Sequence, residues 1–108
     1  MGTYTLTNAA RADLKSIATY TQRKWGKEQR RIYSKQFDDT FLVLAGNPET
    51  GISSDCIKQG YRKFPTGSHV IFFRVISTAE IQVVRILHKR MDVARQLGDV
   101  TPPAGDHF

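Results

Sequence analysis

The chain has 108 residues, of which 40% are hydrophobic, and this length accommodates a single domain with an ordinary core. Its one cysteine, Cys56, excludes an intramolecular disulfide and fits a reducing environment, so we expect a cytoplasmic protein. No apolar run reaches the length of a membrane span, which argues against a membrane partner. The net charge of +6 favours nucleic acid or an acidic protein as partner, without choosing between them.

The N-terminal half predicts a short strand followed by two helices. Tyr4 to Thr7 is β-prone, and Thr7 or Asn8 can then cap a helix that glycine ends at Gly26. A second helix follows almost at once and ends at Gly46. It carries an apolar stripe at helical spacing, which predicts core residues: Tyr33, Phe37, Phe41 and Leu44. The short connection predicts an antiparallel helical hairpin.

The C-terminal half predicts a loop and then strands. Residues 47–55 are turn-rich and polar, and residues 65–68 form a second predicted turn. Three strands are expected, at residues 59–64, 69–76 and 80–88. The second of them is almost continuously apolar (HVIFFRVI), which predicts a strand buried on both faces. A short final helix is expected at 91–97.

These elements, in the order β-α-α-β-β-β, predict an α+β fold in two layers. The strands are expected to form a small antiparallel meander, with the helical hairpin packed on one face of the sheet. The other face is expected to be free for a partner. The domain is expected to span residues 1–99, and residues 100–108 lack periodicity and predict a flexible tail.

Two arginines interrupt the apolar strands. Strict alternation places Arg85 on one face with Ile81 and Val83, and Arg74 on a face with Phe72. A buried guanidinium needs a carboxylate, a carbonyl or water. Two interpretations stay open: each arginine packs its stem and pairs internally or with solvent, or it anchors a partner.

His88 lies at the exit of the last strand, where alternation places it with Val84 and Ile86. A lone histidine in such a position more often packs or caps than catalyses. No metal site is expected for it, for His69 or for His107. The chain also lacks a phosphate-cradling glycine loop and a Ser-His-Asp arrangement, so we expect no cofactor and assign no catalytic residue.

A belt of basic residues surrounds the helical hairpin, opposed only by Glu28. Its members are Arg23, Lys24, Lys27, Arg30, Arg31 and Lys35. The belt is either a solvated helix surface or a patch that approaches an acidic protein or DNA. No base-reading motif is present, so sequence-specific DNA binding by the chain itself is not expected.

Five segments, taken in order between Tyr4 and Asp99, resemble the ParE toxins of the RelE/ParE superfamily. They are YTLTNAARADLKSIATYT, WGKEQ, LAGNPETG, YRKFPTGSHVIFFRV and IQVVRILHKRMD. The resemblance implies the small α+β sandwich and poisoning of DNA gyrase in its cleaved-DNA complex. It also implies inactivation by a cognate antitoxin, whose C-terminal segment wraps the toxin and whose N-terminal part alone contacts operator DNA.

The same superfamily contains the RelE branch, whose members are ribosome-dependent mRNA endonucleases. That chemistry needs basic groups at the scissile phosphate and an acid–base group near the last strand, often a tyrosine. All the tyrosines here precede the last strand, which counts against cleavage: Tyr4, Tyr20, Tyr33 and Tyr61. His88 could still act as the base. Arg62, Arg74 or Arg85 could then hold the phosphate, so RelE-type cleavage stays as the alternative.

The expected binding surfaces follow from the resemblance and from the basic residues. The ILHKRMD segment is the most ParE-like part of the chain, and the target is expected to bind there, at Arg85, His88, Lys89 and Arg90. An acidic antitoxin is expected to bind basic residues of the helices and the sheet, namely Arg30, Arg31, Arg62, Arg74 and Arg85.

Overall fold

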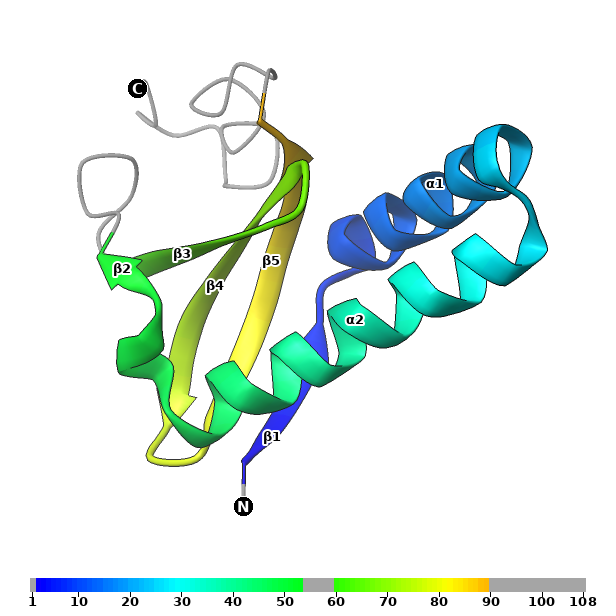
Figure 1. Ribbon diagram of the computed structural model, residues 1–108. Coiled ribbons are helices and arrows are strands. Elements are labelled where there is room, and N and C mark those ends of the chain that lie inside the picture. Colours follow the sequence, from blue (N-terminus) through cyan, green and yellow to red (C-terminus); the bar gives the residue numbers. More distant parts are fainter. Residues whose placement is uncertain (1, 54–59, 90–108) are drawn as a thin grey trace, which may run out of the picture.

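The computed structural model describes residues 2–53 and 60–89, which form a helical hairpin packed on one face of a mixed sheet (Figure 1). The elements are β1 (Thr3–Leu6), α1 (Asn8–Trp25), α2 (Lys27–Gly46), the 3-10 turn η1 (Pro48–Thr50), β2 (Ile52–Ser53), β3 (Tyr61–Thr66), β4 (His69–Ser77) and β5 (Glu80–His88). The two-layer α+β architecture is confirmed. The helix expected at 91–97 and the tail at 100–108 lie outside the described residues.

The sheet has five strands in the order β1-β5-β4-β3-β2. The predicted antiparallel meander of β3, β4 and β5 forms its centre. β1 extends the sheet on one side, parallel to β5, through the pairs Thr3 with Glu80 to Leu6 with Val83. These parallel partners are far apart in the sequence, so no local pattern predicts the pairing.

Two of the expected connections are shorter than predicted. Ile52 and Ser53, placed in a loop by the sequence, form the two-residue strand β2 because they pair with β3. Pro65 and Thr66, predicted as a turn, belong to β3. Proline is tolerated there because β2 pairs only with Arg62 and Lys63, so the outer edge of β3 at Pro65 needs no N–H donor.

The helix ends form where the capping residues predict. The Thr7 hydroxyl accepts a hydrogen bond from the Ala10 amide at 3.0 Å, which satisfies one unpaired donor of the first turn of α1. Gly26 ends α1 with a φ of 98°, a conformation that favours glycine, and α2 begins at the next residue. The apolar stripe of α2 faces the sheet, where Phe37, Phe41 and Leu44 are buried.

Apolar clusters lie on both faces of the sheet. The larger one, on the helix side, joins α1, α2, β4 and β5 and contains Ala10, Phe37, Phe41, Leu44, Ala45, Ile71, Phe73, Ile81, Val83 and Ile86. A smaller one on the opposite face contains Tyr61, Phe72, Val84 and Leu87. Since these side chains are buried, the expectation that the second face is free for a partner is wrong at this part of the sheet.

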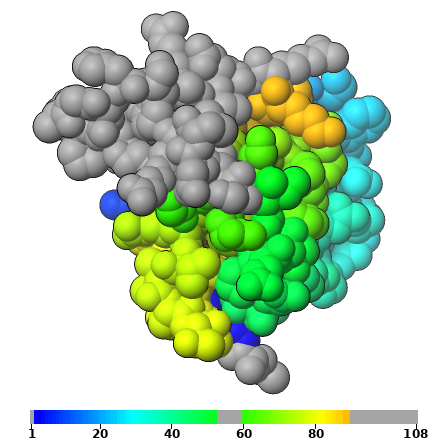
Figure 2. Space-filling model, turned by 90° about the vertical axis from the view of Figure 1, so that its left-hand side faces the viewer, coloured from blue at the N-terminus to red at the C-terminus, as the bar shows by residue number. Residues whose placement is uncertain are grey.

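β4 is buried on both faces over only part of its length. Ile71, Phe72 and Phe73 are buried, whereas residues 74–77 are exposed, including Val75 and Ile76. The helix-side core reaches β4 only at Ile71 and Phe73, so the last residues of the strand extend past it. Figure 2 shows the molecule from the sheet side, with the yellow-green end of β4 and its turn to β5 on the surface. The prediction of a fully buried strand is therefore wrong for its C-terminal half.

Candidate interaction site at the end of β5

A β-bulge in β5 determines which face of the sheet its last residues occupy. Phe72 of β4 pairs with Arg85, whereas the next residue, Phe73, pairs with Val83. Val84 is therefore an extra residue opposite the partner strand. The alternation of side chains shifts by one position at this point.

The bulge overturns the faces predicted by strict alternation. Beyond it, Ile86 joins the helix-side core and Leu87 joins the opposite cluster. Arg85 is paired with Phe72, so it emerges on the face of Leu87 and not with Val83 as predicted. A bulge depends on the pairing between two strands, which periodicity within one strand cannot reveal.

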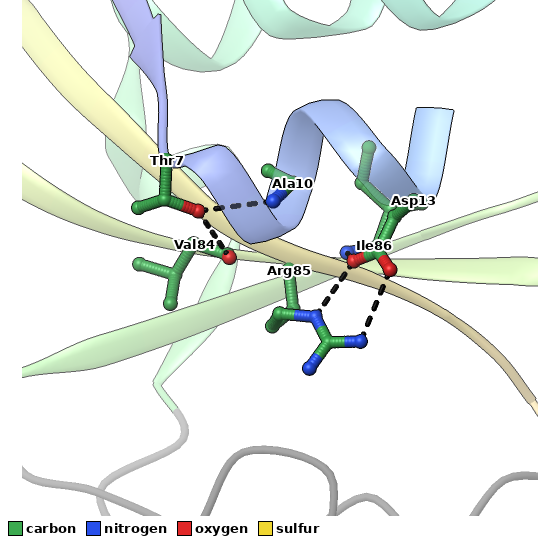
Figure 3. A network of polar contacts seen from close by, with 6 residues as sticks. All are labelled: Thr7, Ala10, Asp13, Val84, Arg85 and Ile86. Atoms are coloured by element: carbon green, nitrogen blue, oxygen red, sulfur yellow. Dashed lines mark hydrogen bonds and ion pairs between the residues drawn. The ribbon is translucent and has the colours of Figure 1, made fainter. Parts of the chain in front are cut away.

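The side chain of Arg85 forms an ion pair with Asp13 of α1 (Figure 3). Arg85 Nε lies 2.7 Å from one carboxylate oxygen of Asp13, and Arg85 Nη2 lies 3.0 Å from the other. The first oxygen also accepts the Ile86 amide N–H at 2.9 Å. The two charged side chains are only 13% and 15% exposed, so this is a largely buried, bidentate pair.

Beyond the end of β1, the start of α1 lies along the edge of β5 and forms hydrogen bonds with it. β1 pairs with β5 no further than Val83, and the next groups on that edge are then satisfied by Thr7 and Asp13. The Thr7 amide donates to the Val83 carbonyl at 3.0 Å, and the Thr7 hydroxyl donates to the Val84 carbonyl at 2.7 Å. Together with the Asp13–Ile86 bond, these contacts attach α1 along the C-terminal half of β5.

His88 belongs to a cluster of polar rings on the helix side of this corner. Its ring lies edge-on to that of His69, with centroids 5.4 Å apart. The Tyr33 hydroxyl lies 2.8 Å from His69 Nδ1. Burial, followed by the nearby His88, lowers the pKa of His69, and Asp13 acts in the opposite direction. His88 therefore does not lie with Val84, as alternation predicted, because the bulge reverses its face.

Lys89 ends the described part of the corner. Its side chain is exposed, and its backbone N–H donates to the Ser68 carbonyl at 3.0 Å, which joins the end of β5 to the β3–β4 turn. The structure thus places Arg85, His88 and Lys89 near the same end of β5, with Arg85 on the outer face of the sheet and His88 on the helix side. Arg90, the fourth expected target-binding residue, lies outside the described residues.

Arg62 and Arg74 occupy opposite faces of the sheet. Arg62 donates to the carbonyls of Pro48 and Gly51, at 3.0 and 2.5 Å, and so attaches η1 to β3. Arg74 is exposed, and its Nε lies 2.8 Å from Oε1 of Gln82. Arg62 therefore stabilises the fold by holding η1 against β3, whereas the side chain of Arg74 is accessible to a partner.

Arg30 and Arg31 lie on the helical hairpin, whereas Arg62 and Arg74 lie on the sheet. Arg30 donates to Oε1 of Gln22 at 2.6 Å and so links α2 to α1, and Arg31 forms a surface ion pair with Glu28 at 2.5 Å. The five residues expected to bind the antitoxin are thus distributed over the hairpin, the edge of the sheet and its outer face. The structure does not bring them together into one surface.

Two further properties concern the described residues, 2–53 and 60–89. They contain no group of three His, Cys, Asp or Glu side chains arranged to hold a metal ion. Neither of the two long helices combines the length and the apolar character needed to cross a bilayer.

Comparison with known proteins places the chain in a family. The family described as "ParE toxin of type II toxin-antitoxin system, parDE" matches residues 4–93, which include the whole corner at the end of β5. The chain belongs to the ParE toxin family. As a member of this family, it is the toxin of a type II toxin–antitoxin system.

Individual relatives agree with this assignment. The chain is 43% identical to Toxin ParE1 of Mycobacterium tuberculosis, over 87% of this chain and 96% of that one. It is 36% identical to Toxin ParE1 of Caulobacter vibrioides, over 91% of this chain and 100% of the relative. A solved structure titled "Chromosomal ParDE TA system from P. aeruginosa" has the same fold, with a TM-score of 0.66 at 23% identity over 82% of this chain and 96% of the other.

Proposed function

We propose that this toxin acts in the cytoplasm by poisoning DNA gyrase and that a cognate antitoxin neutralises it. The observation that carries the proposal is the ParE family match, which extends through the corner at the end of β5. Resemblance to ParE toxins implies gyrase as the target, and the match over residues 4–93 supports that resemblance.

The corner suits a protein-binding role because it is rigidly supported. The Asp13–Arg85 pair attaches α1 to β5, and the Lys89 backbone bond attaches the end of β5 to the β3–β4 turn. The exposed Lys89 and the half-buried His88 are therefore presented from a fixed backbone. We assign His88 and Lys89, with Arg90 next in the chain, to the contact with gyrase, and Arg85 to positioning them.

The polar contacts of the arginines favour gyrase poisoning over RNA cleavage. A ribonuclease needs cations available to the scissile phosphate beside the acid–base group. Among the arginines that the structure describes, Arg85 is the closest to His88 in sequence, and it is paired with Asp13, whereas Arg62 donates to backbone carbonyls. Arg74 is exposed, but it lies on the face of the sheet opposite the cluster of His69 and His88.

The antitoxin contact is proposed to use the exposed half of β4 and the helical hairpin. Arg74 lies there beside the exposed Val75 and Ile76, so this surface offers both a cation and apolar side chains. Arg30 and Arg31 add positive charge on the hairpin. A segment that carries acidic and apolar residues can order on such surfaces when it binds. The toxin then reaches operator DNA only through its antitoxin.

A plasmid assay tests the proposal. Purified toxin is incubated with gyrase, ATP and supercoiled plasmid, and linear plasmid trapped in the cleavage complex is expected to accumulate. Addition of the co-expressed antitoxin is expected to abolish that accumulation. If the toxin leaves gyrase unaffected and instead cuts mRNA on translating ribosomes, the proposed target is wrong and the RelE-type activity is correct.

A further inference from the structure

The tip of the helical hairpin exposes two large aromatic side chains. Tyr20 is 60% exposed and Trp25 is 66% exposed, although tryptophan is usually among the most buried residues by area. Figure 1 shows that this end of α1 and the start of α2 project beyond the sheet. Exposed aromatic surface at one place on a small protein typically marks a binding site.

The same tip concentrates the positive charge of the molecule. Residues 20–31 contain only one acidic residue, Glu28, and five basic ones: Arg23, Lys24, Lys27, Arg30 and Arg31. Glu28 is neutralised by Arg31 in an ion pair. Arg23 and Lys27 are exposed and form no ion pair within the described part of the chain, so their charges are available to an anionic ligand.

Lys24 holds the two aromatic rings next to a positive charge. Its Nζ atom lies 5.7 Å from the ring centroid of Tyr20 and 5.6 Å from that of Trp25, and it donates to the Tyr20 hydroxyl at 3.2 Å. These cation–π contacts order side chains that would otherwise move freely in solvent. Ordered rings lose less entropy when a ligand stacks on them.

We propose that this tip, formed by Tyr20, Arg23, Lys24, Trp25 and Lys27, binds single-stranded nucleic acid. Bases stack on the exposed rings, and the cations hold the flanking phosphates, which is how proteins bind single strands without reading their sequence. A single strand is favoured over a duplex because only unpaired bases expose their ring faces. An acidic protein would satisfy the cations but would leave the flat ring faces unexplained. This inference does not depend on the proposed target of the toxin.

Tryptophan fluorescence offers a direct test, because Trp25 is the only tryptophan of the chain. A single strand of about 15 thymidines is titrated into the full chain at low salt. Quenching that saturates, and that added NaCl reverses, is expected. The uridine strand of the same length is expected to quench as well, since either sugar leaves the bases free to stack. The complementary duplex is expected to bind at least fivefold more weakly.

Charge-reversal variants locate the site by anisotropy of a labelled strand. The Arg23→Glu/Lys27→Glu pair is expected to weaken binding at least tenfold and to reduce the slope of log K against log salt by about 1.4, the loss of two phosphate contacts. Arg11→Glu/Lys15→Glu is the matched control, since it reverses the same amount of charge on exposed residues of α1 away from the tip. It is expected to change affinity less than about twofold. Trp25→Ala is expected to weaken binding about fivefold or more by removing one stacking surface.

Circular dichroism of each variant confirms that the hairpin is still folded. The proposal is overturned if no quenching occurs at low salt, if the duplex binds as tightly as the single strand, or if the control pair loses as much affinity as the tip pair. It is also overturned if the tip variants keep full affinity for the strand but lose gyrase poisoning. In that case the tip is a protein-binding surface.

Discussion

Among single residues, Asp13 joins α1 to β5 through both a side chain and the backbone of the strand. Its carboxylate accepts two bonds from the guanidinium of Arg85 and one from the Ile86 amide. Both charged side chains are less than one-sixth exposed, so the ion pair compensates charge that water reaches poorly.

Replacing Asp13 therefore has a large expected cost. Asp13→Ala removes the carboxylate that pairs with a largely buried guanidinium and accepts the Ile86 amide, which should lower the free energy of unfolding by about 3–5 kcal/mol in urea titrations. The matched control is Asp39→Ala, whose carboxylate pairs with Lys35 at the surface and is 58% exposed. It should cost less than about 1 kcal/mol. Equal losses of unfolding free energy in the two variants would show that the Asp13–Arg85 pair stabilises the fold no more than a surface ion pair does.

His69 makes the stability depend on pH in a definite direction. Its pKa in the folded protein lies below the ordinary value of 6.5, because burial and the neighbouring His88 disfavour the protonated ring. The unfolded chain therefore binds a proton more readily, so stability present above pH 6.5 is lost as the pH falls through the lowered pKa. Denaturant titrations between about pH 7 and pH 5 should show this loss, and His69→Gln should reduce it. An unchanged slope in the variant would assign the effect to other groups.

Among elements, the packing of the start of α1 against β5 depends on the hydrogen bonds of Thr7. Thr7 caps the helix and also donates to Val84, at the residue where the bulge interrupts the strand. Thr7→Val should lower the free energy of unfolding by about 1–2 kcal/mol, since it keeps the shape and removes both bonds. Thr7→Ser should retain most of the stability. Thr5→Val, an exposed threonine on β1, is the control and should have little effect; a loss as large as that of Thr7→Val would refute the capping argument.

For the whole molecule, the target surface and the folding core can be separated by mutation. Lys89 is exposed, so Lys89→Glu combined with Arg90→Glu should leave the unfolding midpoint within about 2 °C of the wild type. The same double substitution should weaken gyrase poisoning at least tenfold in the plasmid assay. Arg11→Glu/Lys15→Glu controls for the change in net charge. A folded Lys89/Arg90 variant that remains fully toxic would move the target surface elsewhere, with Arg30→Glu/Arg31→Glu as the next test.

Local sequence determined the elements of this protein. The helical hairpin followed from a cap at Thr7 or Asn8, the stop at Gly26 and the aromatic stripe from Tyr33, because capping and 3.6-residue periodicity act within a few residues. The three-stranded meander followed from short apolar runs separated by turns. The family could be recognised from the ordered segments alone, before any contact between them was known.

Tertiary structure decided how these elements meet. The parallel pairing of β1 with β5, the short strand β2 and the bulge at Val84 all depend on hydrogen bonds between segments distant in the sequence. The same holds for the candidate site. Neither the Asp13–Arg85 pair nor the contact of Tyr33 with His69 has a local signal, since 72 and 36 residues separate the partners. Periodicity reports which side of its own element a residue occupies, but only the pairing of distant strands determines what that side faces.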